Sequence, residues 1–147
     1  MNTQDLLKAS GALKVVVTGA DGQVKEEREF TNLVVTVGKN FVASRMVGTS
    51  ANVMSHMAIG SSNTPAAAGD TALGTELGRV ALAGASAATN VVTYTATFPA
   101  GTGTGAVVEA GIFNAGSAGT MLCRTVFAVV NKGVDDAMSI TWTVTIS

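Results

Sequence analysis

The stretch from Met138 to Ile146, which reads Met-Ser-Ile-Thr-Trp-Thr-Val-Thr-Ile, decides the fold class of this chain. Large apolar side chains stand at every second position, and serine or threonine fills each position between them. Successive side chains of a strand point to opposite faces of its sheet, so this period of two is typical of a half-buried β-strand. The stretch therefore predicts an antiparallel strand that covers a core with its apolar face.

The same alternation recurs from Val92 to Phe98, where threonines separate apolar residues. Six further stretches are rich in β-branched residues or bounded by turn residues, which predicts strands over 13–18, 23–30, 53–59, 76–82, 106–114 and 120–130. An Asp-Gly pair at Asp21 predicts a hairpin between the first two. The charges of 23–30 indicate an exposed or edge strand, and the small residues of 84–90 predict a turn region.

One segment departs from the period of two. Apolar residues between Leu33 and Met46 recur near helical spacing, which predicts a helix over 36–47. Thr31-Asn32 can cap its start and Gly48 can end it, although the β-branched residues at its start favour a strand. About eight strands, one helix and no strand–helix alternation predict a mainly β protein, either an antiparallel β-sandwich or a flattened barrel with the helix at one side.

The chain has 147 residues, which suits a single domain. We expect an N-terminal arm over 1–11 and a single β domain over 12–147. The arm carries Leu6 and Leu7, and it is either frayed or docked on a neighbouring protein. The loop over 61–72 contains Pro65 and Asp70, and loops of this length are often functional. These four residues are the candidates for a protein interface.

Charged residues make up only 13% of the chain, against about 25% in average soluble domains. The formal net charge is −1, so nothing suggests binding to nucleic acid or to an anionic membrane. The single cysteine, Cys123, excludes an internal disulfide and suits folding in a reducing cytoplasm. No signal peptide and no membrane-spanning run is recognisable. Few charges favour a surface that other protein subunits cover.

Catalytic and metal-binding motifs do not emerge from the sequence. His56 is the only histidine, and no nucleophile motif accompanies it. One histidine and one cysteine are too few for structural zinc. Asp135 and Asp136 are typical of turn chemistry, and the Gly101–Gly105 stretch lacks the lysine of a phosphate loop, so we expect a flexible hairpin tip. We expect no enzyme activity, no metal and no cofactor.

Four charged residues, Glu76, Arg79, Glu109 and Arg124, lie inside otherwise apolar strands. Charges at such positions are usually paired when buried. Glu109 and Arg124 lie on consecutive predicted strands and can face each other across a hairpin. We therefore expect structural ion pairs that fix strand register or a subunit interface, and exchanging Glu109 with Arg124 should then restore what each single substitution loses.

From Met57 onward the chain resembles a family of small virion proteins of tailed bacteriophages. The matching pieces follow one another in order: Met57-Ala58-Ile59-Gly60, Gly69 to Glu76 with Arg79, Val108 to Asn114, Arg124-Thr125-Val126-Phe127, Asn131-Lys132, and Ile140 to Val144. Asn32-Leu33 and the helical segment after it fit the start of such proteins. The resemblance covers most of the chain after about residue 30.

The resemblance implies a structural role in the virion. Without repeats or heptads, a compact chain fits a capsid cement (decoration) protein that binds the major capsid protein on the capsid surface, as a trimer or a dimer. A tail, baseplate or fibre-associated protein is the alternative. A carbohydrate-binding module is a lesser one, because such modules usually need exposed aromatic residues, and the only tryptophan and tyrosine are predicted to point inward.

Overall fold

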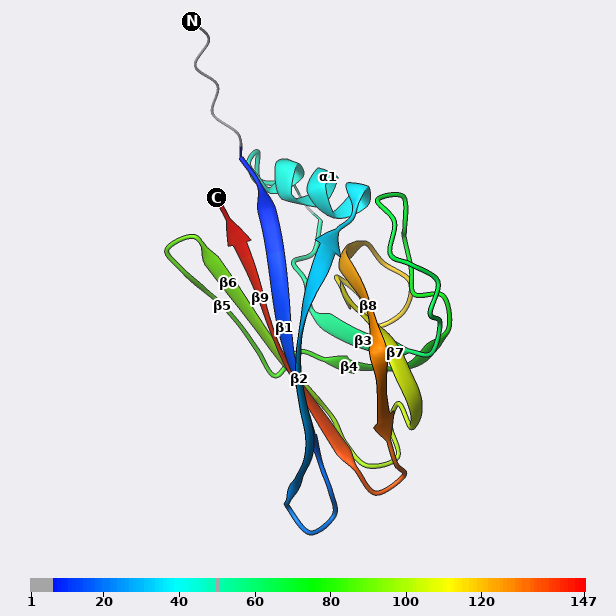
Figure 1. The fold of residues 1–147 in the computed structure, drawn as a ribbon. Coiled ribbons are helices and arrows are strands. Elements are labelled where there is room, and N and C mark those ends of the chain that lie inside the picture. Colours follow the sequence, from blue (N-terminus) through cyan, green and yellow to red (C-terminus); the bar gives the residue numbers. More distant parts are fainter. Residues whose placement is uncertain (1–6, 50) are drawn as a thin grey trace, which may run out of the picture.

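Figure 1 shows the computed structural model of the chain, which describes residues 7–49 and 51–147. The protein is mainly β, with one helix, as the sequence predicts. Its elements are β1 (Ala9–Thr18), β2 (Val24–Val34), α1 (Thr36–Arg45), β3 (His56–Gly60), β4 (Glu76–Ala81), β5 (Gly84–Ala88), β6 (Val91–Phe98), β7 (Gly105–Phe113), β8 (Met121–Lys132) and β9 (Ala137–Ile146).

The strands form a single curled sheet in the order β4-β3-β7-β8-β2-β1-β9-β6-β5, and each neighbouring pair is antiparallel. The sheet folds over at β2, which gives a first half-sheet of β2, β1, β9, β6 and β5 and a second of β8, β7, β3 and β4. Strand β2 pairs with β1 from Val24 to Asn32 and with β8 only at Leu33 and Val34. The two half-sheets therefore separate below this junction (Figure 1).

The main core lies between the half-sheets, and β9 is its central strand. Its side chains alternate as expected: Met138, Ile140, Trp142 and Val144 are buried, and the residues between them are half-buried or exposed. Trp142 is opposite Leu13 of β1 and Tyr94 of β6. Complete burial of a large apolar side chain contributes about 1.5–3 kcal/mol, so this strand stabilises the sandwich strongly.

The loop over 61–75 covers the second half-sheet on its outer side, and helix α1 lies against β8 at the end of the sheet, where Phe41 and Val42 also pack against the main core. Gly38 allows the close approach of the helix, since a Cβ there would lie 2.0 Å from the carbonyl oxygen of Leu122. A second, smaller core of Val35, Ala58, Phe113 and Met121 fills this layer. Residues 121–125 of β8 are consequently buried on both faces, which fits the unbroken apolar run Met121-Leu122-Cys123 at the start of this strand.

The helix begins at Thr36, as predicted, but its start is not capped as expected. Strand β2 continues to Val34, so Thr31 and Asn32 lie inside a strand, and the residue before the helix is Val35, which makes no side-chain cap. The helix ends at Arg45. Gly48, at a φ of 65°, donates its backbone N–H to the Arg45 carbonyl and closes the turn that follows.

Other boundaries also differ from the prediction. Residues 84–88 form strand β5, so the predicted turn region is in fact half of a hairpin that turns at Thr89 and Asn90. Strand β3 begins at His56 rather than at residue 53. Strand β1 begins at Ala9, within the range expected for the arm, and Lys8 already exchanges backbone hydrogen bonds with Ser147.

Candidate functional site

Glu109 of β7 lies at the centre of a buried polar cluster under the 61–75 loop. Its carboxylate is 0% exposed and accepts three backbone N–H bonds, from Ser62 at 2.8 Å, Gly74 at 2.8 Å and Thr75 at 2.9 Å. The side chain therefore fixes both ends of the loop to the sheet. Hydrogen bonds to a buried carboxylate are stronger than those between neutral groups.

Arg124 of β8 completes this cluster. Its guanidinium is 2% exposed and donates to the Glu109 Oε1 at 3.1 and 3.2 Å, to the Asp70 Oδ2 at 2.9 Å and to the Thr64 carbonyl at 3.0 Å. Asp70, a candidate for the interface, is thus bonded within the chain, and its carboxylate also accepts the N–H of Ala67. With five donors on Glu109, the cluster offers no free base or nucleophile and holds the loop in place.

Glu76 and Arg79 form a separate ion pair on β4. The guanidinium meets the Glu76 carboxylate at 2.7 and 3.2 Å and lies 3.9 Å from the centre of the Phe113 ring. It also donates to the carbonyls of Ala115 at 3.0 Å and Ala118 at 2.9 Å. Arg79 therefore ties the β7–β8 turn to β4, so the four charged strand residues make two pairs on neighbouring parts of one half-sheet.

His56 lies half-buried at the start of β3. Its Nδ1 lies 2.8 Å from the Ser55 Oγ, and its ring sits beside Gly116 of the β7–β8 turn. Within the described part of the chain, no three side chains of the His, Cys, Asp or Glu types cluster closely enough to hold a metal ion. The surroundings of the imidazole are those of a structural side chain.

Asp136, which the sequence predicts only as a turn residue, links the β8–β9 turn to the β1–β2 hairpin. The Asp136 carboxylate accepts the Gly133 N–H at 2.8 Å and contacts the Lys25 Nζ at 3.1 Å. The Gly133 N–H and the Lys25 ammonium lower the pKa of Asp136. Lys132 is buried next to it, donates to the Pro99 carbonyl at 2.9 Å, and has its pKa lowered by burial. The residues next to Lys132 in the sequence, Asn131 and Gly133, give no sign that this lysine is buried.

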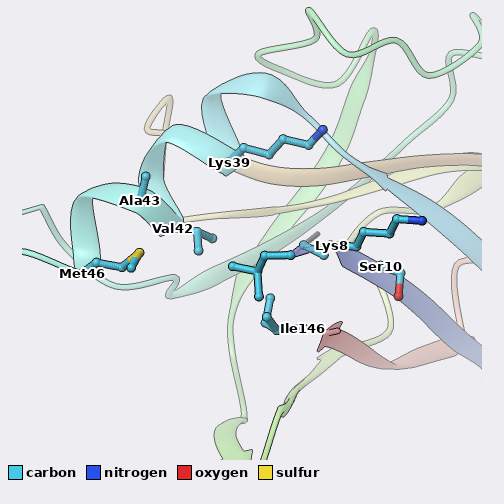
Figure 2. A pocket seen from close by; sticks show the side chains of 9 residues that line it. Lys8, Ser10, Lys39, Val42, Ala43, Met46 and Ile146 are labelled. Carbon is cyan, nitrogen blue, oxygen red and sulfur yellow. The ribbon is translucent and has the colours of Figure 1, made fainter. Parts of the chain in front are cut away.

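Figure 2 shows a groove of about 430 Å³ between α1 and the adjoining ends of β1 and β9. Val42, Met46 and Ile146 line its apolar floor, and Lys8 and Lys39 lie at its rim. Leu7 also lines it and is 74% exposed, while Met46 is 80% exposed. Of the two leucines expected in an interface, Leu7 is therefore at an apolar opening and Leu6 lies outside the described residues.

Pro65 lines a second, shallower cleft of about 480 Å³, where β2 separates from β8. Leu33 and Val126 form its other sides. Below this cleft the rings of Phe30 and Phe127 stack with their centroids 4.5 Å apart, which closes the space between the two diverging strands.

The outer side of β5, β6 and β9, one part of the first half-sheet, carries hydroxyl groups instead of charges. Threonines of β6 and β9 lie side by side in register, with Thr93 opposite Thr143 and Thr95 opposite Thr141. No ionisable group except Tyr94 occurs from Val80 to Val108, and no charged side chain occurs from Ala137 to Ser147. We call the outer surface of β5, β6 and β9 the neutral face. The charges nearest to it lie on β1 and β2, where Lys14 pairs with Glu27.

The aromatic residues that a sugar site would need are absent from this face. Trp142, the only tryptophan of the chain, is 0% exposed, and its ring points into the core. Tyr94 is half-buried against the same core, and burial raises its pKa to about 12. Neither ring can stack on a carbohydrate at the surface.

No known protein family, curated protein or solved structure matches the chain. Among the described residues, α1 is too short to cross a bilayer and no other helix qualifies. The proposal for what this chain contacts is therefore argued from the residues on the protein surface.

Proposed function

We propose that this chain is a structural protein of a tailed-phage virion, most specifically a capsid cement protein that binds the major capsid protein and copies of itself. The neutral face is the observation that carries this proposal. A sheet surface with rows of threonine and no charge can be covered by protein with little desolvation cost, since hydroxyls re-form hydrogen bonds and no ion has to leave water.

The internal bonding of the polar clusters supports the same role. Glu109, Arg124 and Arg79 use their hydrogen-bonding groups to fix loops onto the sheet. A subunit of a shell benefits from such pre-organised loops, because ordering a loop on binding would reduce the affinity. The cleft at Pro65 adjoins the 61–75 loop, and the groove beside α1 is a second opening, with an apolar floor. The resemblance to small virion proteins is the reason for proposing the major capsid protein as the partner.

Weak contacts are sufficient for this role. A standard protein interface buries about 1,600 Å² in total. When one subunit touches several lattice partners, its contacts act together by effective concentration and the assembly is stronger than any one contact.

The first test is the number of copies in purified virions of the phage that encodes the chain, measured by quantitative mass spectrometry against the major capsid protein. A cement protein is expected in amounts comparable to the major capsid protein. A dozen copies or fewer would assign the chain to the tail, baseplate or fibre, and its absence from virions would reject a structural role altogether.

The second test examines the neutral face directly, by co-sedimentation of purified chain with capsid shells that lack it. Thr141→Lys adds a charge on the exposed outer side of β9, at the border of the face next to Lys14 of β1, and we expect it to lower shell occupancy by about tenfold or more. Ala100→Lys adds the same charge at an exposed loop position outside the face and is expected to bind like the unmodified chain. Equal occupancy for both variants would remove the neutral face from the contact.

A further inference from the structure

Strand β5 leaves one edge of the sheet open. It pairs only with β6, and four of its five residues are exposed. Ala85, Ala87 and Ala88 are small, Ser86 is neutral, and the strand contains neither proline nor charge. Figure 1 shows the β5–β6 hairpin at the margin of the molecule, with β5 outermost. An edge of this kind presents unpaired backbone N–H and C=O groups to any strand that approaches.

The other free edges of the described sheet are obstructed. Strand β4, at the opposite end, carries Glu76 and Arg79, and Gly78 lies against the backbone of Gly103. Strand β2 pairs with β1 on one side, and its other edge is free before Leu33. This stretch bears five consecutive charges, Lys25 to Glu29. Charges on an edge prevent unwanted strand pairing.

The unpaired part of β8 is also closed. It lies beside β2, and the stacked rings of Phe30 and Phe127 fill the space between the two strands. Among the edges that the structure describes, β5 is thus the one with neither charge nor cover.

We propose that β5 is a self-pairing edge, at which two copies of this chain join their β5 strands antiparallel about a two-fold axis through Ser86. The sequence from Gly84 to Ala88 is centred on Ser86, so this register pairs all five residues with their counterparts. The same patch on both copies then satisfies both edges, which closes the assembly as a dimer instead of a filament. The inference stands on the sheet edge and holds whether or not the chain is a virion protein.

The partner is a second copy because the strand is complementary to itself. Alanine and serine are small enough for two hairpins to approach at sheet spacing without a clash. No charge lies between Val80 and Val108 in either copy, so no repulsion opposes the pairing. The two neutral faces become continuous across the axis, since the outer threonines of both copies lie on one extended sheet.

The decisive experiment is disulfide trapping of the full chain. Directly opposed side chains in an antiparallel pair have Cβ atoms about 4.5–5.5 Å apart, and small adjustments bring them within disulfide reach. Ser86→Cys should form a covalent dimer under mild oxidation, seen on non-reducing gels at micromolar protein. Cys123 is fully buried and does not compete.

Ser139→Cys is the matched control. It is an exposed serine on the same half-sheet, but its strand is paired on both sides. We expect little covalent dimer from it. Equal trapping at Ser86 and Ser139 would indicate random collision and overturn the proposal.

Sedimentation equilibrium of the unmodified chain and two lysine variants gives the second measurement. Ser86→Lys brings two like charges together at the axis and should weaken dimerisation by about tenfold or more. Thr141→Lys, which carries its charge on the neutral face away from the edge, should dimerise like the unmodified chain. An unmodified chain that remains monomeric at millimolar concentration, or equal weakening by both substitutions, would reject the β5 dimer.

The two proposals fail separately. If Thr141→Lys loses shell binding but still dimerises, the neutral face is needed for shell binding and not for the dimer. If the unmodified chain binds shells normally but forms no dimer, only the β5 proposal is rejected.

Discussion

Arg124 has three bonding partners, which come from two parts of the chain. It joins Glu109 on the neighbouring strand with Asp70 and Thr64 on the loop. A guanidinium suits this position because its planar donors can reach several acceptors at once. Leu73 packs against the smaller core at one end of the loop, whereas Thr64 and Asp70 are bonded to Arg124, so the order of this other part depends on the charge.

Arg124→Met should lower the free energy of unfolding by about 3–5 kcal/mol, because it leaves the Glu109 carboxylate buried without its counter-charge. Urea denaturation measures the change. Arg28→Met is the control, since Arg28 forms an exposed pair with Glu26 and such pairs contribute about 0–1 kcal/mol. Similar losses for both variants would contradict the assigned role of Arg124.

The structure also changes the expectation for exchanging the two residues. Glu109 accepts three backbone N–H groups besides Arg124. An arginine at 109 would face these donors with donors of its own, so the exchange is not expected to restore stability. Glu109→Gln combined with Arg124→Met retains an acceptor and removes the buried charge, and this pair should recover part of the loss.

Asp136 should make the protein sensitive to acid. Because its pKa is lowered in the folded chain, its carboxylate contributes stability above its ordinary value of 3.8, and this contribution disappears as the pH falls through the folded value. Asp136→Asn should therefore be less stable than the unmodified chain at neutral pH, with the difference shrinking in acid. Urea unfolding from about pH 7 to about pH 2 measures it.

Asp135→Asn provides the comparison for that experiment, since its exposed side chain belongs to the same turn. Its stability should follow that of the unmodified chain at every pH. A difference between Asp136→Asn and the unmodified chain that persists unchanged in strong acid would exclude the Asp136 carboxylate as the titrating group.

At the scale of elements, α1 shows how close packing can override intrinsic propensity. Glycine inside a helix is unfavourable by about 1 kcal/mol relative to alanine. Gly38 nevertheless occupies the point of contact with β8, where the backbone of Leu122 leaves no room for a Cβ. The helix can therefore lie directly on the strand and complete the smaller core.

Gly38→Ala should destabilise the protein by about 1–3 kcal/mol, although helix propensity alone predicts the opposite sign. The Cβ would force α1 away from β8 and expose part of the smaller core. Thermal unfolding followed by circular dichroism measures the effect. Gly69→Ala, in a loop position with open space around it, should be nearly neutral, and a stabilised Gly38→Ala would refute the contact.

The elements that the sequence predicted well are those whose alternation is enforced by the main core. Strands β6 and β9 match their predicted ranges within one residue, because one of their faces packs against Leu13 and its neighbours. The pairing of Glu109 with Arg124 could also be anticipated from buried charges on consecutive strands. The additional bonds from Asp70 and the loop backbone could not, since they depend on how the loop folds.

Strand β5 and the end of β2 were missed for physical reasons. Alanine, serine and glycine have low strand propensity, so β5 owes its conformation to pairing with β6. Thr31 and Asn32 look like helix-capping residues, but Thr31 pairs with Ala12 and its carbonyl accepts the Thr125 hydroxyl. In both cases long-range pairing determines the structure, and local sequence carries no sign of it.

At the scale of the molecule, charged and uncharged residues occupy different strands of the first half-sheet. The charged β1–β2 hairpin lies on one side of the first half-sheet and the neutral face on the other. Such a distribution keeps a chain soluble through one region while another remains free to be covered. It also orients the molecule, because only one side can be buried without removing ions from water.

Removal of Met1–Leu6 tests the expected arm. The deletion stops short of the Lys8–Ser147 backbone pair, whose bonds are 2.6 and 2.8 Å long, and of strand β1. We expect the free energy of unfolding to change by less than about 0.5 kcal/mol while binding to capsid shells decreases. Undiminished shell binding would leave the arm without a role. The longer deletion, to Ser10, would also remove β1–β9 pairs and could not separate the two effects.

Strand β2 belongs to both half-sheets, since one part of it pairs with β1 and its end pairs with β8. If one half-sheet unfolded alone, the hydrogen bonds between β2 and the other half-sheet would also have to break. Amide protons of β1 and β9 should consequently exchange with solvent at the same opening free energy as those of β7 and β8, as a single cooperative unit. If the chain is part of a pressurised capsid, mechanical load would unfold both half-sheets together and would not open one of them alone.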